Sequence, residues 1–246
     1  MSTPLTPDEL DRLLERKRQL AALEERDPEL ARRLQALRAW QSARLVRTYE
    51  DLRRDPRYGA AATFFLSDLY GPEGSRARDQ CVIRAWSRLK HTLPQAVLRV
   101  LREALELDVL TAQLDQALAG HLGGSALTDL TYAAAYRAAG QADVRARQID
   151  LIVGIGAALE RAVQLPLVGL ALQAAHLPAH LAGFGVLQDF LERGHAAFRA
   201  MRGATLFLQI IRARETLIMH KLFAGAIEPF AGNRGGESHP AGTREP

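Results

Sequence analysis

The sequence predicts an all-α protein, a multi-helix globular bundle that begins with an antiparallel helical hairpin. Apolar residues recur along most of the chain at spacings of three and four, which is the period of a helix. Nowhere does the strict apolar-polar alternation that marks a strand occur between turn residues. Hydrophobic residues make up 48% of the 246 residues, enough to bury a substantial core.

The N-terminal hairpin is predicted from two helix-start signals. The stretch "TPDE" at 6–9 is a capping box with proline at the first helical position, and leucines then recur to about residue 23. Asp27 followed by proline starts a second helix, which we expect to reach about residue 54. The connection is short, so helices 8–23 and 28–54 should be antiparallel neighbours. Their seam is expected to contain Leu30, Leu34, Leu37 and Trp40.

A third helix is predicted to begin at Asp55-Pro56, to carry the stretch "YGAAATFFLSDLYGP" at 58–72 and to end at the glycine-proline stop at 71–72. Phe65 and Leu69 share one helical row, and Tyr70 lies on the next. A recognition site needs an exposed ring, whereas rings on adjacent rows favour packing. We therefore interpret Phe65, Leu69 and Tyr70 as structural and expect them to contact a central helix at 95–120.

The remaining helices follow from periodicity and from glycine or proline breaks. They are expected at about 75–91, 94–120, 126–140, 142–164, 187–201 and 204–224, with a shorter helical stretch between Pro166 and Pro178. The helix at 95–120 is apolar on nearly every side, which is typical of a central element. We divide the chain into an N-terminal hairpin at 1–56, a helical core domain at 57–230 and a disordered tail at 231–246.

Composition argues against several classes of protein. The formal net charge of +4 is spread over mixed signs, and aromatic residues lie opposite the basic faces, so we do not expect nucleic-acid binding. Cys81 is the single cysteine, which we interpret as a buried, inert thiol in a reducing cytosol. The N-terminus has no signal-peptide core, and the most apolar window is interrupted by charges and proline. We therefore expect a cytoplasmic protein with no membrane contact.

Two patterns resemble metal-binding elements. His176 and His180 are four residues apart, but Pro178 lies between them and is expected to start a helix, which would separate the two rings. Residues 192–195 read Glu-x-x-His, the spacing found in di-iron sites, yet such sites need a second element of the same kind. We interpret the residues at 192–195 as a surface or boundary pair and predict no metal site.

Patterns for catalysis are also lacking. The stretch "VGIGAAL" at 153–159 resembles a dinucleotide-binding glycine loop, but it lies in mid-helix, where its glycines allow close helix packing. No Gly-x-Ser-x-Gly, Walker or metalloprotease pattern occurs, and Cys81 has no neighbouring base in sequence. We assign no catalytic, cofactor-binding or metal residues, expect no cofactor, and incline to a protein that is not an enzyme.

Charge placement gives two further expectations. Asp108 shares a helix face with Val97 and Leu101, and a lone buried carboxylate costs several kcal/mol, so we predict that it is buried and paired with a cationic or hydroxyl group from another helix. Residues 76–102 hold seven Arg or Lys and one Asp, whereas 103–129 hold five acids and no Arg or Lys. The two segments should attract.

One motif resembles a known family. "FFLSDLYGP" at 64–72, with Arg-Asp at 78–79, resembles the motif that names a family of uncharacterised bacterial proteins, the FFLEELY motif proteins. Ser67 and Asp68 stand where the family name has two glutamates. The stretches "LELDVLTAQLD" and "LQDFLERGHAAFRAM" are also similar to this family. The resemblance implies a bacterial origin and supplies no catalytic residues.

From these observations we expect a non-enzymatic cytoplasmic helical protein that acts by binding a protein partner or by self-association. The contact surface would be the hairpin at 8–54 or the basic face at 76–102. The alternative is a helical domain that binds a small molecule or haem, globin-like, with phenylalanine-rich helices lining an apolar pocket. The haem version needs an axial ligand, most often His.

Overall fold

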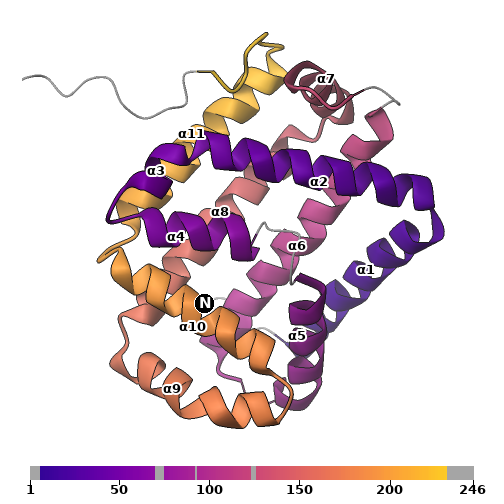
Figure 1. Cartoon of the computed structure of the whole chain (residues 1–246). Coiled ribbons are helices and arrows are strands. Elements are labelled where there is room, and N and C mark those ends of the chain that lie inside the picture. Colours follow the sequence, from indigo (N-terminus) through magenta and orange to yellow (C-terminus); the bar gives the residue numbers. More distant parts are fainter. Residues whose placement is uncertain (1–5, 70–74, 92, 123–125, 232–246) are drawn as a thin grey trace, which may run out of the picture.

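The protein is helical throughout the part that the computed structural model describes, residues 6–69, 75–91, 93–122 and 126–231. Eleven α-helices and one short π-helix lie within these ranges, and none of these residues forms a strand (Figure 1). The prediction of an all-α, multi-helix globular fold is confirmed. The expected tail falls almost wholly outside the described residues.

The elements follow one another in this order: α1 Pro7–Arg26, α2 Pro28–Thr48, α3 Glu50–Arg54, α4 Gly59–Phe64, the π-helix η1 Phe65–Leu69, α5 Ser75–Leu89, α6 Gln95–His121, α7 Asp129–Ala139, α8 Ala142–Val163, α9 Pro166–Leu181, α10 Gly185–Ala200 and α11 Thr205–Phe223. The 27-residue α6 packs against α1, α2, α7 and α8, so the expectation of a central helix here is confirmed.

The N-terminal helices begin as predicted but pack differently. The side chain of Asp27 caps α2 by accepting from the amides of Glu29 and Leu30, each at 3.0 Å. From this corner α1 and α2 diverge, and α1 lies chiefly along α6 (Figure 1). The predicted seam between the two helices is wrong. Leu34 and Leu37 pack in a cluster formed with residues of α6, α7 and α11.

Two predicted helices are interrupted. The helix expected at 28–54 breaks at Tyr49, which has φ −113° and ψ 20°, and resumes as α3. The phenylalanine-rich motif begins as α4 and continues as the π-helix η1. The ring of Phe65 lies 5.7 Å from both Phe198 of α10 and Phe207 of α11, so its predicted contact with the central helix is corrected. Tyr70, the side chain of Leu69 and the glycine-proline stop lie outside the described residues.

The prediction for Asp108 is half right. Its carboxylate pairs with Lys17 Nζ of α1 at 2.5 Å, so the cationic partner from another helix is confirmed. Burial is wrong, because the side chain is 47% exposed. α1 crosses α6 at this turn with a long lysine side chain, whose flexible stem keeps the ion pair at the surface. The buried carboxylate of α6 is Asp115, two turns further along the same face.

The expected attraction between 76–102 and 103–129 is largely wrong. The ion pair between Arg102 and Glu106 is a local one, four residues apart in α6. Lys90 instead pairs with Asp11 of α1 at 3.0 Å. Residues 95–121 of the two segments form one continuous helix, α6, whereas the rest of the basic segment lies largely on α5, and Lys90 finds its partner on α1.

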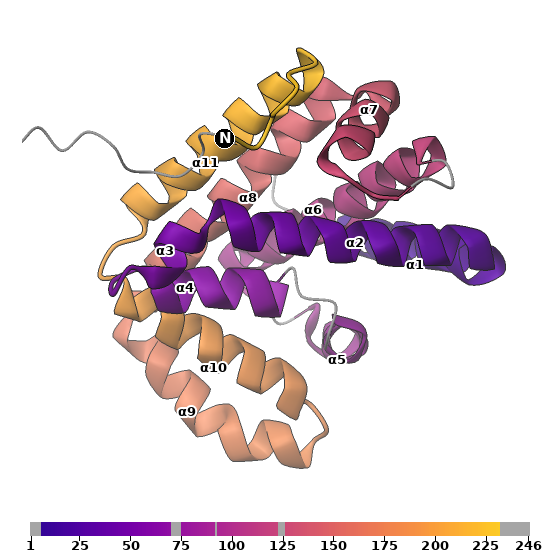
Figure 2. The same ribbon diagram turned by 45° about the horizontal axis from the view of Figure 1, so that its top comes forward.

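α9 and α10 form a helical hairpin at one end of the molecule (Figures 1 and 2). Pro178 lies inside α9, so the expectation that it starts a helix is wrong. Among the described residues no single helix is long and apolar enough to cross a membrane. α8 and α9 pass that test only as a pair, which is bent by 86° at its break.

Candidate ligand-binding cavity

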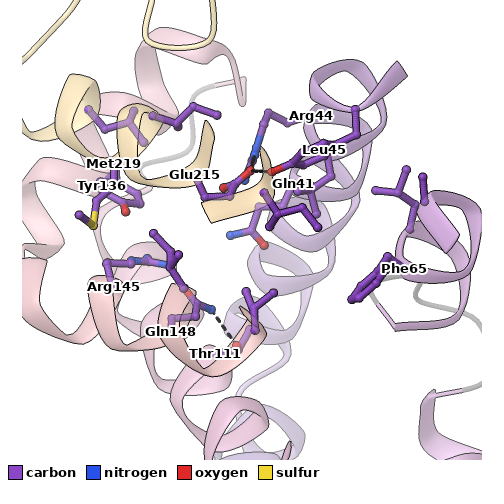
Figure 3. A pocket seen from close by; sticks show the side chains of 18 of the residues that line it. Gln41, Arg44, Leu45, Phe65, Thr111, Tyr136, Arg145, Gln148, Glu215 and Met219 are labelled. Atoms are coloured by element: carbon purple, nitrogen blue, oxygen red, sulfur yellow. Dashed lines mark hydrogen bonds and ion pairs between the residues drawn. The ribbon is translucent and has the colours of Figure 1, made fainter. Parts of the chain in front are cut away.

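A cavity of about 140 Å³ lies between α2, α6, α8 and α11 and is closed by parts of α3, α4, η1 and α7 (Figure 3). An engineered protein cavity of roughly 150 Å³ accommodates benzene, so this volume suits a small organic molecule. Most of the wall is apolar and comes from Leu45, Leu52, Phe65, Leu66, Ile149, Ile152, Phe207, Ile211, Ile218 and Met219. Phe65 of the motif is therefore both a packing residue and part of the wall.

One polar group of the wall joins α2 to α11. Glu215 Oε1 accepts a hydrogen bond from Arg44 Nη1 at 2.7 Å and another from the hydroxyl of Tyr49 at 2.8 Å. Burial is the largest single influence on the pKa of Arg44 and lowers it, but the charge of Glu215, the hydrogen bond to Glu215 and the neighbouring tyrosines together raise the pKa overall. Burial, followed by the charge of Glu215, raises the pKa of Tyr49 well above its usual value. The trio is charge-neutral, although Nε of Arg44 has no hydrogen-bond partner among the described residues.

A second polar group centres on Asp115 of α6. Its Oδ1 accepts from Gln41 Nε2 at 3.1 Å, and its Oδ2 lies 3.8 Å from Arg38 Nε. Burial raises the pKa of Asp115, and the hydrogen bond from Gln41 together with the charges of Arg145 and Arg38 opposes this rise incompletely. The carboxyl group is thus poorly compensated for a position that is almost fully buried.

The third polar group is Arg145 of α8, whose side chain reaches the cavity (Figure 3). Its residue is 6% exposed, and its guanidinium lies 4.6 Å from the ring centroid of Tyr136. Among the described residues, Nη1 of Arg145 has Gln148 Oε1 as an acceptor at 3.5 Å, and Nε of Arg145 has no hydrogen-bond partner. Gln148 in turn donates to Thr111 Oγ1 at 2.8 Å. A guanidinium has five N–H donors, and for Arg145 the described residues supply one long contact to Nη1 and no acceptor for Nε.

The local sequence explains how this arginine enters the interior. Gly140 and Gln141 have φ values of 67° and 66°, a left-handed turn that aims α8 back into the bundle. Arg145 then lies one helical turn before Ile149, on the face that packs inward. Further along α8, a Cβ at Gly156 would lie 2.5 Å from Leu208, so the expected close helix packing holds at Gly156, whereas a Cβ at Gly154 would meet only Glu103 at 3.9 Å.

The sequence-based analysis missed the residues of this cavity. Arg44, Asp115, Arg145 and Glu215 carry no motif, and each is unusual only as a charge on an inward-facing helix position. The same argument predicted a buried carboxylate at Asp108. That residue is on the correct helix, α6, but two turns before Asp115, which is buried. Cys81 is buried as expected. Glu192 contacts His176, so the residues at 192–195 do not act as a unit.

A family model described as a domain of unknown function, DUF8198, matches residues 17–229, and the chain belongs to this family. No curated protein and no solved structure matches the chain. The family description assigns no activity, so the geometry of the cavity and of the surface has to carry any functional conclusion.

Proposed function

We propose that this member of the family binds a small molecule that joins an apolar body to a carboxylate, inside the cavity between α2, α6, α8 and α11. The observation that supports this proposal is Arg145, a buried guanidinium with one long contact to an acceptor and an unpartnered Nε. Leaving such a group unpaired is costly, whereas a carboxylate can accept two hydrogen bonds from it.

Charge balance in the cavity points to the same ligand class. Arg44 is neutralised by Glu215, while Arg145 has no carboxylate within ion-pair distance among the described residues. Asp115 offers only partial compensation, because burial favours its neutral form. An anion with a small apolar body would complete the pairing of Arg145 and fill the apolar wall.

Benzoate is a suitable probe because its ring matches the cavity volume and its carboxylate matches Arg145. We expect benzoate to raise the melting temperature of the purified protein, since a ligand that binds only the folded state stabilises it by mass action. Benzyl alcohol, which has the same ring without the charge, should have a much smaller effect. Equal effects of the two compounds would contradict the proposal.

The matched variants are Arg145→Met and Arg147→Met. Arg147 lies two residues away but is half-exposed and pairs with Glu106 at the surface, so its loss should leave the benzoate effect intact. Arg145→Met should abolish the effect. Replacing a buried charge by an apolar side chain of similar size is often neutral or stabilising, so this variant should still fold. A benzoate effect that survives in Arg145→Met would overturn the proposal.

The haem version of a ligand-binding function has no support in this cavity. The described residues that line it include no histidine, which is the commonest axial ligand.

Binding to a protein partner is a second candidate, and the surface of α9 favours it. α9 has no buried residue, and Leu167, Leu170, Leu177 and Leu181 lie on one side of it, between 61% and 81% exposed. A contiguous exposed apolar patch often marks an interaction site. The row carries no charge, so it suits self-association.

Leu167→Glu with Leu170→Glu should lower the apparent mass in light scattering if the row joins two copies. A wild-type monomer at high concentration would count against self-association.

The proposal extends to finer points of identity. We infer a cytoplasmic bacterial protein related to the FFLEELY motif proteins, supported by the motif at 64–72 and by the single cysteine.

A further inference from the structure

Two histidines of α9 lie together on the side that faces α10. His176 and His180 are one helical turn apart, with ring centroids separated by 4.6 Å. Continuation of α9 through Pro178 produces this arrangement, because a helix start at that proline would have placed the two rings on different elements. Both side chains are partly exposed, so an ion can reach them from solvent.

Two carboxylates of α10 meet these histidines. His176 Nδ1 lies 2.9 Å from Glu192 Oε1 and 3.1 Å from Oε2. His180 Nε2 lies 2.9 Å from Asp189 Oδ1. One donor atom from each of His176, His180 and Asp189 falls within 4.8 Å of the other two. A tetrahedral zinc ion with ligands at about 2.0 Å keeps its donor atoms roughly 3.3 Å apart, so small rotations of these side chains would bring them into range.

A buried glutamine positions one of the carboxylates. Gln188 Nε2 donates to Glu192 Oε1 at 2.8 Å and to the carbonyl of Leu172 in α9 at 2.7 Å. Such outer-shell hydrogen bonds are what orient the ligands in metal sites.

A glycine makes room for one of the imidazoles. A Cβ at Gly185, the first residue of α10, would lie 2.6 Å from Nδ1 of His180. The ring therefore rests directly on the backbone of α10 with its Nε2 directed at Asp189. This placement is specific to glycine at that position.

We propose that His176, His180, Asp189 and Glu192 form a Zn²⁺ site that fastens α9 to α10. Two neutral imidazoles and two carboxylates give four N and O donors with a net charge of −2, which suits a divalent ion. Imidazole ligands favour zinc over magnesium or calcium, which prefer oxygen alone. Four protein ligands leave no open position, the pattern of a structural rather than a catalytic site.

The position of the site explains what the ion would do. α9 has no buried residue, so apolar burial contributes little to holding it in place. A metal bridge between the two helices would supply that attachment, and it lies to one side of the exposed leucine row of α9. The site is separate from the cavity described above and does not depend on a ligand there.

The test is a zinc titration of the untagged full-length protein after treatment with EDTA. In isothermal calorimetry with ZnCl₂ we expect one equivalent to bind, with no comparable binding of Mg²⁺ or Ca²⁺. Zinc should also raise the melting temperature of the wild-type protein. His176→Ala with His180→Ala should weaken zinc binding by about 100-fold or more, beyond the 10- to 100-fold that outer-shell changes typically cost.

Three further variants keep the proposal falsifiable. His121→Ala with His220→Ala removes two exposed histidines elsewhere and should bind zinc like the parent. Gln188→Ala and Gly185→Ala retain all four ligands and should each weaken binding by about tenfold. Circular dichroism checks that every variant is folded. The proposal is overturned if the wild type takes up no zinc, or if the variant without His176 and His180 binds it as tightly as the control.

Discussion

Two regions of the molecule break the rule that charged residues lie at the surface and apolar residues in the core. They are the interior between α2 and α11 and the outer side of α9, and they break it in opposite ways. The interior holds the charges of Arg44, Asp115 and Arg145, with Arg145 6% exposed. The outer side of α9 instead presents leucines to solvent, with Leu181 81% exposed. Charges are seldom buried unless paired, and apolar patches are seldom left open, so each departure marks a region where folding alone does not explain the residue choice.

The comparison also separates two sources of stability. The interior of the bundle depends on paired charges and close packing, whose loss leaves an uncompensated group or a void. α9 has no buried residue and depends on its surface contacts with α10 and, in our proposal, on a metal ion. Substitutions in the first region should therefore alter global stability, and substitutions in the second should alter association or metal binding.

The largest effect is expected for Glu215→Ala. It leaves Arg44 buried without its carboxylate and removes the acceptor of the Tyr49 hydroxyl, which should lower the free energy of unfolding by about 3–5 kcal/mol. Urea denaturation followed by circular dichroism measures the change. Glu228→Ala, at an exposed position, is the control and should leave the midpoint unchanged. A loss under about 1 kcal/mol for Glu215→Ala would mean that the trio is not a structural unit.

Phe65→Ala should come next, at about 3 kcal/mol, because its ring packs between Phe198 and Phe207 and lines the cavity. For a chain of this length the melting temperature should fall by about 6–12 °C. Ser67→Ala, two residues away and exposed, should change it little. If Phe65→Ala melts like the parent and instead loses a bound ligand, the motif is a recognition site.

Asp115→Asn should raise stability by about 1 kcal/mol at neutral pH, because it removes a poorly compensated buried charge. The folded-state pKa of Asp115 lies above the unfolded value, so its stabilising contribution is present below the unfolded pKa and is lost as pH rises through the folded pKa. Stability measured from acid to neutral pH should fall less steeply in the variant than in the parent. Identical pH profiles for the two proteins would contradict this account.

The smallest effect is expected for Leu177→Ala on α9, because Leu177 is 64% exposed. The variant for comparison is Leu118→Ala on α6, where the same side chain is 0% exposed. The exposed change should stay within about 0.5 kcal/mol. The buried change removes the same atoms and should cost about 2–5 kcal/mol. Thermal unfolding of both variants tests the contrast directly. A large loss at Leu177 would show that the leucine row is covered in solution.

Sequence reasoning recovered the helices where periodicity was strong. The start of α2 at Asp27 and the central α6 follow from caps and apolar rows, which are local properties of the chain. The partners of each helix were harder to predict. Leu34 faces α6 and α11 rather than α1, because which surface an apolar row meets depends on the whole bundle.

The candidate sites depend on distant residues in the same way. Gln148 and Tyr136 are close to Arg145 in sequence, but the spacing along α8 does not show that the other helices bring no carboxylate within ion-pair distance of it. His176 and His180 were noticed, but Asp189 and Glu192 join them only after the turn between α9 and α10. A spacing rule considers the residues of one helix, whereas each of these sites takes its residues from two or more helices.

The pairing of Arg44 with Glu215 has a consequence for protein synthesis. The two residues are 171 positions apart, and the hydroxyl of Tyr49 finds its acceptor 166 positions later. A ribosome therefore releases most of the chain before the charge on α2 can be neutralised. We expect the N-terminal helices to stay loosely packed until then, because contacts between residues so far apart in sequence form slowly. The apolar surface of these helices is exposed in the meantime. We therefore expect the bundle to complete its packing only after α11, the last helix in the sequence, has been synthesised.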